Sequence, residues 1–219
     1  MTEELKTETV VIGSGPGGAV TAALLAEAGR SVTVLEEGEA LAASSCAPFS
    51  LDEMRSKYRN AGITPAFGPA KIAYVEGKVL GGGSEINSAL YHRTPEPALA
   101  DWSRRFEVAG LSAAEMAPHF EALERELSVV KLPGRPSEAS DRLAKGARAV
   151  GLEAVEVPRM FAYSGQTDAD GLPIGRRRSM SETFLPRARA AGARILPRCR
   201  AVRIYQYGAG WRLRLAGPG

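Results

Sequence analysis

The stretch from residue 9 to residue 36 constrains the fold of this 219-residue chain most strongly. It consists of an apolar segment, a glycine-rich turn at residues 13–18 (GSGPGG), an alanine-rich segment closed by Gly29, and a second apolar segment that ends at Glu36. This order predicts a strand, a tight turn, a helix and a second, parallel strand. The chain is therefore expected to fold as an α/β protein.

The glycine turn has the spacing G-x-G-x-x-G, which seats the ADP half of a dinucleotide. Gly13 permits the sharp turn, Gly15 lets the backbone approach a pyrophosphate, and Gly18 lets the helix lie close to the strand. The phosphates are expected at the helix N-terminus, where free N–H groups favour negative charge. Glu36 is placed to accept hydrogen bonds from ribose hydroxyls. A glycine turn in an unrelated α/β protein is the alternative, and it leaves Glu36 unexplained.

Charge, cysteine content and the lengths of apolar runs indicate which partners this protein binds and in which cellular compartment it is found. The formal net charge is only +3, and no aromatic residues interleave with the basic run at 176–178, so nucleic-acid binding is not expected. Cys46 and Cys199 are far apart in the sequence and form no metal or redox motif, so we expect no metal site. No signal peptide precedes Thr9, and no apolar run approaches the length of a membrane span. These features indicate a cytoplasmic protein.

Local patterns predict the remaining elements. Residues 94–100, with two prolines, are expected to form a linker, and the arginine- and glycine-rich segment 165–178 a loop. Pro118 is expected to break or restart a helix. Alternating residues after Val202 predict a β-hairpin with one buried face. The other expected elements are helices near 51–58, 84–90, 102–127, 138–150 and 181–191, and strands at 72–75 and 193–196.

A second glycine-rich block spans residues 81–93 (GGGSEINSALYHR). By themselves, three glycines and a serine form a general anion-binding nest. Together with the first motif, the block resembles the glucose–methanol–choline (GMC) family of flavin oxidoreductases. Members carry two glycines, a small residue, a serine or threonine, and an asparagine three residues later, commonly followed by an arginine. The matching positions are Gly81, Gly82, Ser84, Asn87 and Arg93.

The resemblance continues in order through residues 93–95, 101–102, 112–124 and 181–193 and covers nearly the whole chain. It is closest to the bacterial long-chain-alcohol-oxidase-like branch of the family. It implies a glutathione-reductase-like, FAD-binding Rossmann domain that is interrupted by part of a substrate domain. The implied segments are the first part of the FAD domain at 1–93, a mostly helical substrate-domain segment at 94–178, and a return to the FAD domain, with a helix and a β-hairpin, at 179–219.

The resemblance also implies a bound FAD. The first glycine motif and Glu36 would hold its ADP half, and the second block would contact the pyrophosphate and the flavin. Ala201 has the position at which a residue meets the adenine through its backbone. Asn87 offers the flavin both a donor and an acceptor, with helix capping as its alternative role. The expected cofactor-binding residues are Gly13, Ser14, Gly15, Pro16, Gly17, Gly18, Glu36, Gly81, Gly82, Gly83, Ser84, Asn87, Ser88 and Ala201.

Ile86 stands where some family members carry a histidine that is bonded covalently to the flavin, so non-covalent FAD is expected. The proton-accepting histidine of the family lies near the C-terminus of longer chains, and neither His92 nor His119 matches it. We therefore assign no catalytic residue in this chain. A second polypeptide, either a separate subunit or a cleavage product, is expected to complete the fold and to supply that histidine.

The reaction implied by the resemblance is oxidation of an alcohol, with hydride transfer from the CH–OH carbon to flavin N5. Three alternatives stay open: a non-catalytic nucleotide-binding structural or regulatory subunit, a nicotinamide-dependent dehydrogenase, and a flavoenzyme of the same fold with lyase-type chemistry. The cysteine-rich run of many long-chain-alcohol members is absent before Ser181. The identity of the alcohol substrate therefore stays open.

Overall fold

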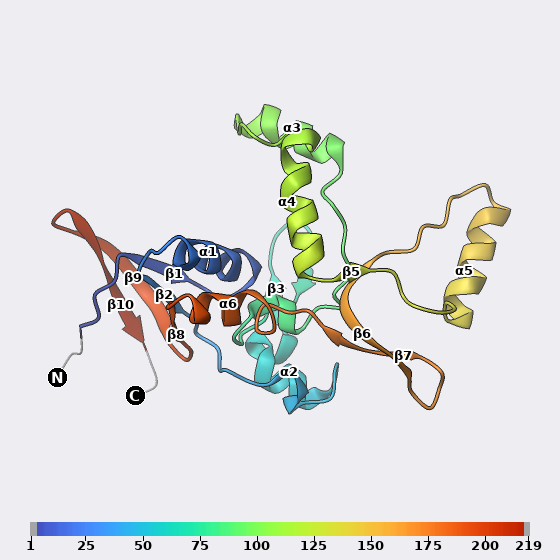
Figure 1. Ribbon diagram of the computed structural model, residues 1–219, viewed down its shortest axis with the longest axis horizontal. Helices are drawn as coiled ribbons and strands as arrows, with labels where there is room; N and C mark the ends of the chain where they lie inside the picture. The colour runs from blue at the N-terminus through green and yellow to red at the C-terminus, as the bar shows by residue number, and fades with distance from the viewer. Residues whose placement is uncertain (1–3, 217–219) are drawn as a thin grey trace. The chain divides into compact units, whose positions relative to one another are not determined.

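A computed structural model describes residues 4–216 of the chain (Figure 1). These residues form two compact units, of which the second interrupts the first in the sequence. The first unit contains the residues up to Ser88 and those from Ser179 onward, and the second unit contains Ala89–Arg178. The second unit therefore begins a few residues before the segment 94–178 that the sequence suggested for a substrate domain.

The first unit is built on a parallel sheet with the strand order β1–β2–β8. Strands β1 (Thr9–Ile12) and β2 (Val32–Leu35) pair in parallel, and helix α1 (Pro16–Glu27) connects them. Strand β8 (Arg194–Leu196) pairs in parallel with the other edge of β2. Every residue of β2 is buried, as expected for the central strand of a parallel sheet. The βαβ unit and the mixed α/β class predicted from the sequence are confirmed.

Two helices pack together beside this sheet, as Figure 1 shows. They are α1 and α6 (Phe184–Ala190), which contact each other along their lengths. Small alanine side chains let α1 approach its neighbours closely, and larger apolar side chains of α6 fill the remaining space. The side chains that become buried in this layer are Ala19, Ala22, Ala23, Ala26, Phe184, Leu185 and Ala188.

Short elements and two antiparallel hairpins complete the first unit. Ser50 caps α2 (Leu51–Lys57) by accepting a hydrogen bond from the Glu53 N–H at 3.1 Å. The hairpins are β3 (Thr64–Ala66) with β4 (Ile72–Tyr74), and β9 (Arg200–Tyr207) with β10 (Gly210–Ala216). Single 3₁₀ turns occur at Ala43–Ser45, Arg59–Gly62 and Gly82–Glu85.

The second unit combines three helices with a small antiparallel sheet of order β5–β6–β7. Helices α4 and α5 bury none of their side chains, and α3 buries only Leu99. The unit therefore has little core of its own. Its helices are α3 (Glu96–Phe106), α4 (Ala113–Glu126) and α5 (Glu138–Ala149), and its strands are β5 (Val129–Val130), β6 (Arg159–Thr167) and β7 (Pro173–Arg177).

Two differences from the sequence prediction concern prolines, at the start of α3 and inside α4. Residues 94–100 are not a linker, because α3 begins within them with Pro95 as its N-cap and Pro97 in its first turn, where a missing N–H costs little. Pro118 does not break α4. The capping box of Ser112 and Glu115 anchors the start of that helix, and Ala114, whose carbonyl loses a partner, is exposed to water.

Tertiary and turn contacts explain the other differences. The helix expected at 84–90 is a 3₁₀ turn that ends at Glu85, and Ala89 adopts a φ of 52° that a helix excludes. The segment 165–178 is not a loop but the hairpin β6–β7, whose turn is held by Asp168 Oδ1 accepting from the Leu172 N–H at 2.9 Å. The hairpin β9–β10 forms as predicted, but it buries neither face.

Candidate functional site

The two glycine motifs lie directly against each other in the first unit. Ser14 is fully buried, and its Oγ accepts a hydrogen bond from the Gly81 N–H at 2.9 Å. A Cβ atom at Gly82 would lie 2.8 Å from the Cα of Gly15, and Gly82 has a φ of +57°. A side chain at Gly82 would therefore separate the two motifs. Residues that are 67 positions apart in the sequence form one backbone surface.

Helix α1 starts at this surface. Gly15 is its N-cap and makes no side-chain cap bond, so the N–H groups of the first turn stay available to an anionic ligand. Gly18 holds the helix against β1, because a Cβ there would lie 2.0 Å from the Gly13 carbonyl oxygen. The first motif thus has the geometry that its spacing predicts for a strand–turn–helix unit.

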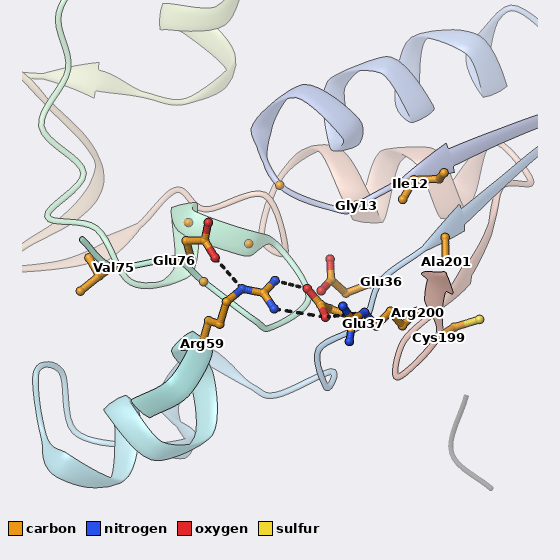
Figure 2. A pocket seen from close by; sticks show the side chains of 14 residues that line it. Ile12, Gly13, Glu36, Glu37, Arg59, Val75, Glu76, Cys199, Arg200 and Ala201 are labelled. Atoms are coloured by element: carbon orange, nitrogen blue, oxygen red, sulfur yellow. Dashed lines mark hydrogen bonds and ion pairs between the residues drawn. The ribbon is translucent and has the colours of Figure 1, made fainter. Parts of the chain in front are cut away.

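A cavity of about 500 Å³ borders both motifs (Figure 2). It also reaches the start of β9, where Ala201 lies, and the segment that leads into the second motif. All of these residues belong to the first unit. The lining residues are Ile12, Gly13, Gly15, Glu36, Glu37, Arg59, Val75, Glu76, Gly77, Gly82, Gly83, Cys199, Arg200 and Ala201.

Some of the cofactor-binding residues suggested by the sequence line the cavity, and the others do not. Suggested residues in the lining are Gly13, Gly15, Glu36, Gly82, Gly83 and Ala201. Suggested residues outside the lining are Ser14, Pro16, Gly17, Gly18, Gly81, Ser84, Asn87 and Ser88. Two residues outside the lining contact its backbone or its neighbours: Gly18 lies against Gly13, and Ser14 bonds to Gly81.

Glu36 lies at the end of β2 and is 5 % exposed. Its Oε2 accepts hydrogen bonds from the Ser14 N–H at 3.0 Å and the Ser14 hydroxyl at 2.6 Å, and its Oε1 accepts one from the Gly38 N–H at 2.8 Å. In this structure the Glu36 carboxylate therefore ties the glycine turn to the tip of β2. It does so at the border of the cavity, where a carboxylate oxygen retains further acceptor capacity.

The second motif divides into buried and exposed residues. Ser84 is buried, and its Oγ donates to the Gly81 carbonyl at 2.8 Å and accepts from the Met180 N–H at 2.9 Å. It thereby joins the returning chain to the glycine block. Asn87 and Ser88 are exposed, and the Asn87 N–H donates to the Gly83 carbonyl at 3.1 Å. Asn87 does not cap a helix, because none begins there.

A charged cluster in the cavity wall escaped the sequence analysis. The Arg59 guanidinium contacts the carboxylates of Glu37 and Glu76, and Arg200 approaches Glu37 at 3.8 Å (Figure 2). Hydrogen bonding from Arg59 lowers the pKa of Glu37 below its ordinary value, and the same bond raises the pKa of Arg59. Glu37 adjoins Glu36 in the sequence, but no spacing rule connects Arg59 with either carboxylate.

Other reactive side chains are placed as follows. Cys199 lines the cavity, and burial raises the pKa of its thiol. His92 and His119 are exposed side chains of the second unit. Residues 4–216 contain no group of three or more His, Cys, Asp or Glu side chains that are arranged to hold a metal ion. Within the same range, each helix is too short or too polar to cross a bilayer.

Sequence comparisons identify relatives along most of the chain. A family model described as GMC oxidoreductase matches residues 11–213. An uncharacterized GMC-type oxidoreductase, y4nJ of Sinorhizobium fredii, is 34% identical over 208 residues, which cover 92% of this chain and 40% of the relative. The long-chain-alcohol oxidase FAO3 of Arabidopsis thaliana is 30% identical over 202 residues, which cover 91% of this chain and 27% of the relative. The chain thus spans less than half the length of these relatives.

Solved structures show the same fold at lower sequence identity. Pyridoxine 4-oxidase from Mesorbium loti superposes with a TM-score of 0.68 at 17% identity, over 97% of this chain and 46% of that one. An FAD-dependent oxidoreductase from Chaetomium thermophilum gives a TM-score of 0.70 at 20% identity, over 95% of this chain and 42% of that one. With its glycine motifs joined at one cavity and the family model matched from residue 11 to residue 213, this chain belongs to the GMC oxidoreductase family.

Proposed function

We propose that this chain is the FAD-binding part of a flavin-dependent enzyme that oxidises an alcohol. The observation that carries the proposal is the contact of Gly82 with Gly15 beside the cavity. Two glycine motifs that meet in this way expose backbone N–H groups without side chains in front of them, which suits a long anionic cofactor. Relatives named as alcohol oxidases support the choice of substrate class.

The residues of the cavity fit the parts of FAD in a consistent order. The pyrophosphate would lie at Gly13, Gly15 and the N-terminus of α1, and Gly82 would flank it from the second motif. Glu36 would accept hydrogen bonds from the ribose, and the Ala201 backbone would meet the adenine. Ser84 would support the cradle from behind, because its hydroxyl bonds to Gly81 and Met180.

When bound, FAD supplies the acceptor for the hydride that leaves the alcohol carbon. The contribution of this chain is to bind and orient that cofactor through backbone donors. Asn87 is exposed beside the glycine block and would serve the flavin end. Ile86 is 7 % exposed and carries no nucleophilic atom, which supports non-covalent attachment of the cofactor.

The base that accepts the hydroxyl proton would come from residues outside this chain. His92 and His119 are exposed and lie in the second unit, and neither matches the position of the family base. The completing residues belong either to the same polypeptide or to a second one. A base of this kind needs hydrogen-bond reach to the substrate hydroxyl and a pKa near the operating pH.

Alkylation of the two cysteines tests the cofactor site. Cys199 lines the cavity and Cys46 does not, so Cys46 is an internal control. We expect FAD and ADP to slow maleimide labelling of Cys199, riboflavin to have no effect, and Cys46 to react equally in all samples. Peptide mass spectrometry measures both sites. Equal labelling of Cys199 with and without FAD would contradict the site.

Flavin reduction then tests the chemistry. With the completing residues present, we expect a long-chain primary alcohol to bleach the visible absorbance of the bound flavin under anaerobic conditions. The corresponding alkane is the matched control and should cause no bleaching, since it has no hydroxyl group. A flavin-loaded assembly that no alcohol reduces would refute alcohol oxidation while leaving the cofactor site in place.

A further inference from the structure

Arg59 lines the cavity but belongs to neither glycine motif. It follows Tyr58, the C-cap of α2, and its backbone N–H donates to the Glu76 carbonyl at 2.9 Å. Its guanidinium contacts both Glu37 carboxylate oxygens and, through Nε, the Glu76 carboxylate (Figure 2). One side chain therefore joins the end of β2 to the segment that precedes the second glycine motif.

The charges in the cavity wall do not balance. Among the described residues that line it, the carboxylates are Glu36, Glu37 and Glu76, and the cationic groups are Arg59 and Arg200. The pyrophosphate of FAD is a dianion at neutral pH, so a wall with excess carboxylate repels the ligand proposed for it. A cation that holds those carboxylates is needed before such a ligand can bind.

Arg59 is better placed for this task than Arg200. The Arg59 side chain is 31% exposed, whereas that of Arg200 is 66% exposed and 3.8 Å from its partner. Interactions with the more buried arginine are screened less by solvent. Glu76 has Arg59 as its ion-pair partner, whereas Glu37 also has Arg200. Loss of Arg59 would therefore leave Glu76 uncompensated beside the cavity.

Protonation of Glu37 does not relieve the excess negative charge at neutral pH. The hydrogen bonds from Arg59 hold the pKa of Glu37 below its ordinary value, so this carboxylate stays ionised. The compensation then comes from nearby cations: Arg59 lowers the pKa of Glu37 most, and the charges of Arg200 and Lys78 lower it further.

We propose that Arg59 is a positioning residue for the cofactor: it compensates the charge of Glu76 and, together with Arg200, that of Glu37, and so permits an anionic dinucleotide to bind at the glycine motifs. The inference rests on the proposed FAD site. It differs from a purely structural role, in which Arg59 would only fasten two segments together. The two roles predict opposite outcomes when Glu76 is neutralised as well.

Titration of FAD by flavin fluorescence measures the effect on the full chain. We expect Arg59→Gln to raise the FAD dissociation constant roughly tenfold, because a charge-assisted contact is lost and two carboxylates are released. Arg59→Lys keeps the charge without the planar fork and should fall in between. Glu76→Gln alone should leave the affinity unchanged or raise it.

The double variant Arg59→Gln with Glu76→Gln decides between the roles. Charge compensation predicts recovery of most of the lost affinity, whereas a fastening role predicts no recovery. Riboflavin, which has no phosphate, serves as a ligand whose affinity Arg59→Gln should not change. Arg142→Gln removes the same charge from an exposed pair with Glu138 in α5 and is the matched control.

The possible failures are distinguishable. If the unchanged chain binds no FAD, the proposed function fails. If it binds FAD and Arg59→Gln binds equally well, or the double variant shows no recovery, the role of Arg59 is overturned. Thermal melts without ligand show whether each variant is folded. If Arg59→Gln folds poorly, the FAD affinities of Arg59→Lys and Glu76→Gln are compared instead. We expect Arg59→Lys to bind FAD more weakly than Glu76→Gln, and equal affinities would also overturn the inference.

Discussion

At the scale of single residues, neighbouring glycines of α1 have different roles. A Cβ at Gly18 would lie 2.0 Å from the Gly13 carbonyl oxygen and 3.2 Å from a methyl group of Val11, whereas a Cβ at Gly17 would meet no atom within 4 Å. Gly18 is therefore required by the close approach of helix and strand. Gly17 is required by no contact with the protein.

Alanine substitutions at the two positions give a matched pair. Gly18→Ala should lower the free energy of unfolding by about 2 kcal/mol, because the helix must move away from β1. Gly17→Ala should raise it by up to about 1 kcal/mol, since alanine favours the helix and nothing obstructs its methyl group. Urea denaturation followed by circular dichroism measures both. Equal changes would mean that α1 does not lie this close to β1.

At the scale of elements, the end of the second glycine-rich block is fastened to α4. Arg93 forms a bidentate pair with Glu124, with both N···O distances at 2.6 Å. Tyr91 lies beside this pair, and its N–H donates to the Pro158 carbonyl at 2.9 Å. Burial and the neighbouring Glu124 carboxylate raise the pKa of Tyr91 to about 12.

This shift makes the stability of the protein depend on alkaline pH. The folded pKa of Tyr91 is above the ordinary value of 10.0, so its contribution is fully present below pH 10 and is lost as the pH rises toward 12. Tyr91→Phe should therefore lose less stability over that interval than the unchanged chain. Urea unfolding at a series of pH values tests this. Parallel pH curves for the two proteins would show that Tyr91 titrates normally.

At the scale of the whole chain, apolar surface is left uncovered. In the hairpin β9–β10, Ile204 pairs with Leu213 and Trp211 pairs with Gln206, so these four share one face, while arginines and tyrosines occupy the other. Ile204 is 51% exposed and Trp211 is 70% exposed. Exposed apolar groups of this size indicate a surface that another segment covers. The relatives, whose additional length has no counterpart in this chain, have residues available for that role.

Solution behaviour tests this surface. The chain by itself should self-associate, and a variant with Ile204→Lys and Trp211→Lys should associate less, since the apolar face becomes charged. Its melting temperature should stay the same, because neither side chain is buried. Arg203→Lys on the opposite face is the control. Light scattering measures association, and a monomeric unchanged chain would contradict the expectation.

Local signals determined much of the fold from the sequence alone. The G-x-G-x-x-G spacing and the apolar runs beside it define β1, α1 and β2, because strand, turn and helix there are specified by adjacent residues. The alternation of β9–β10 is equally local, and its two faces separate as the sequence predicts. The convergence of Gly15 and Gly82 followed from the resemblance to a family, not from any local pattern.

Only the tertiary structure decided the rest, because those features depend on partners that are distant in the sequence. Ser84 lies inside the 3₁₀ turn Gly82–Glu85, where its hydroxyl accepts a hydrogen bond from the distant Met180 N–H, and the expected helix does not form after it. Arg59 reaches the cavity wall only because the fold brings the ends of α2 and β2 together. Alternation showed that the hairpin had an apolar face, but burial of that face requires a covering segment, which no local pattern supplies.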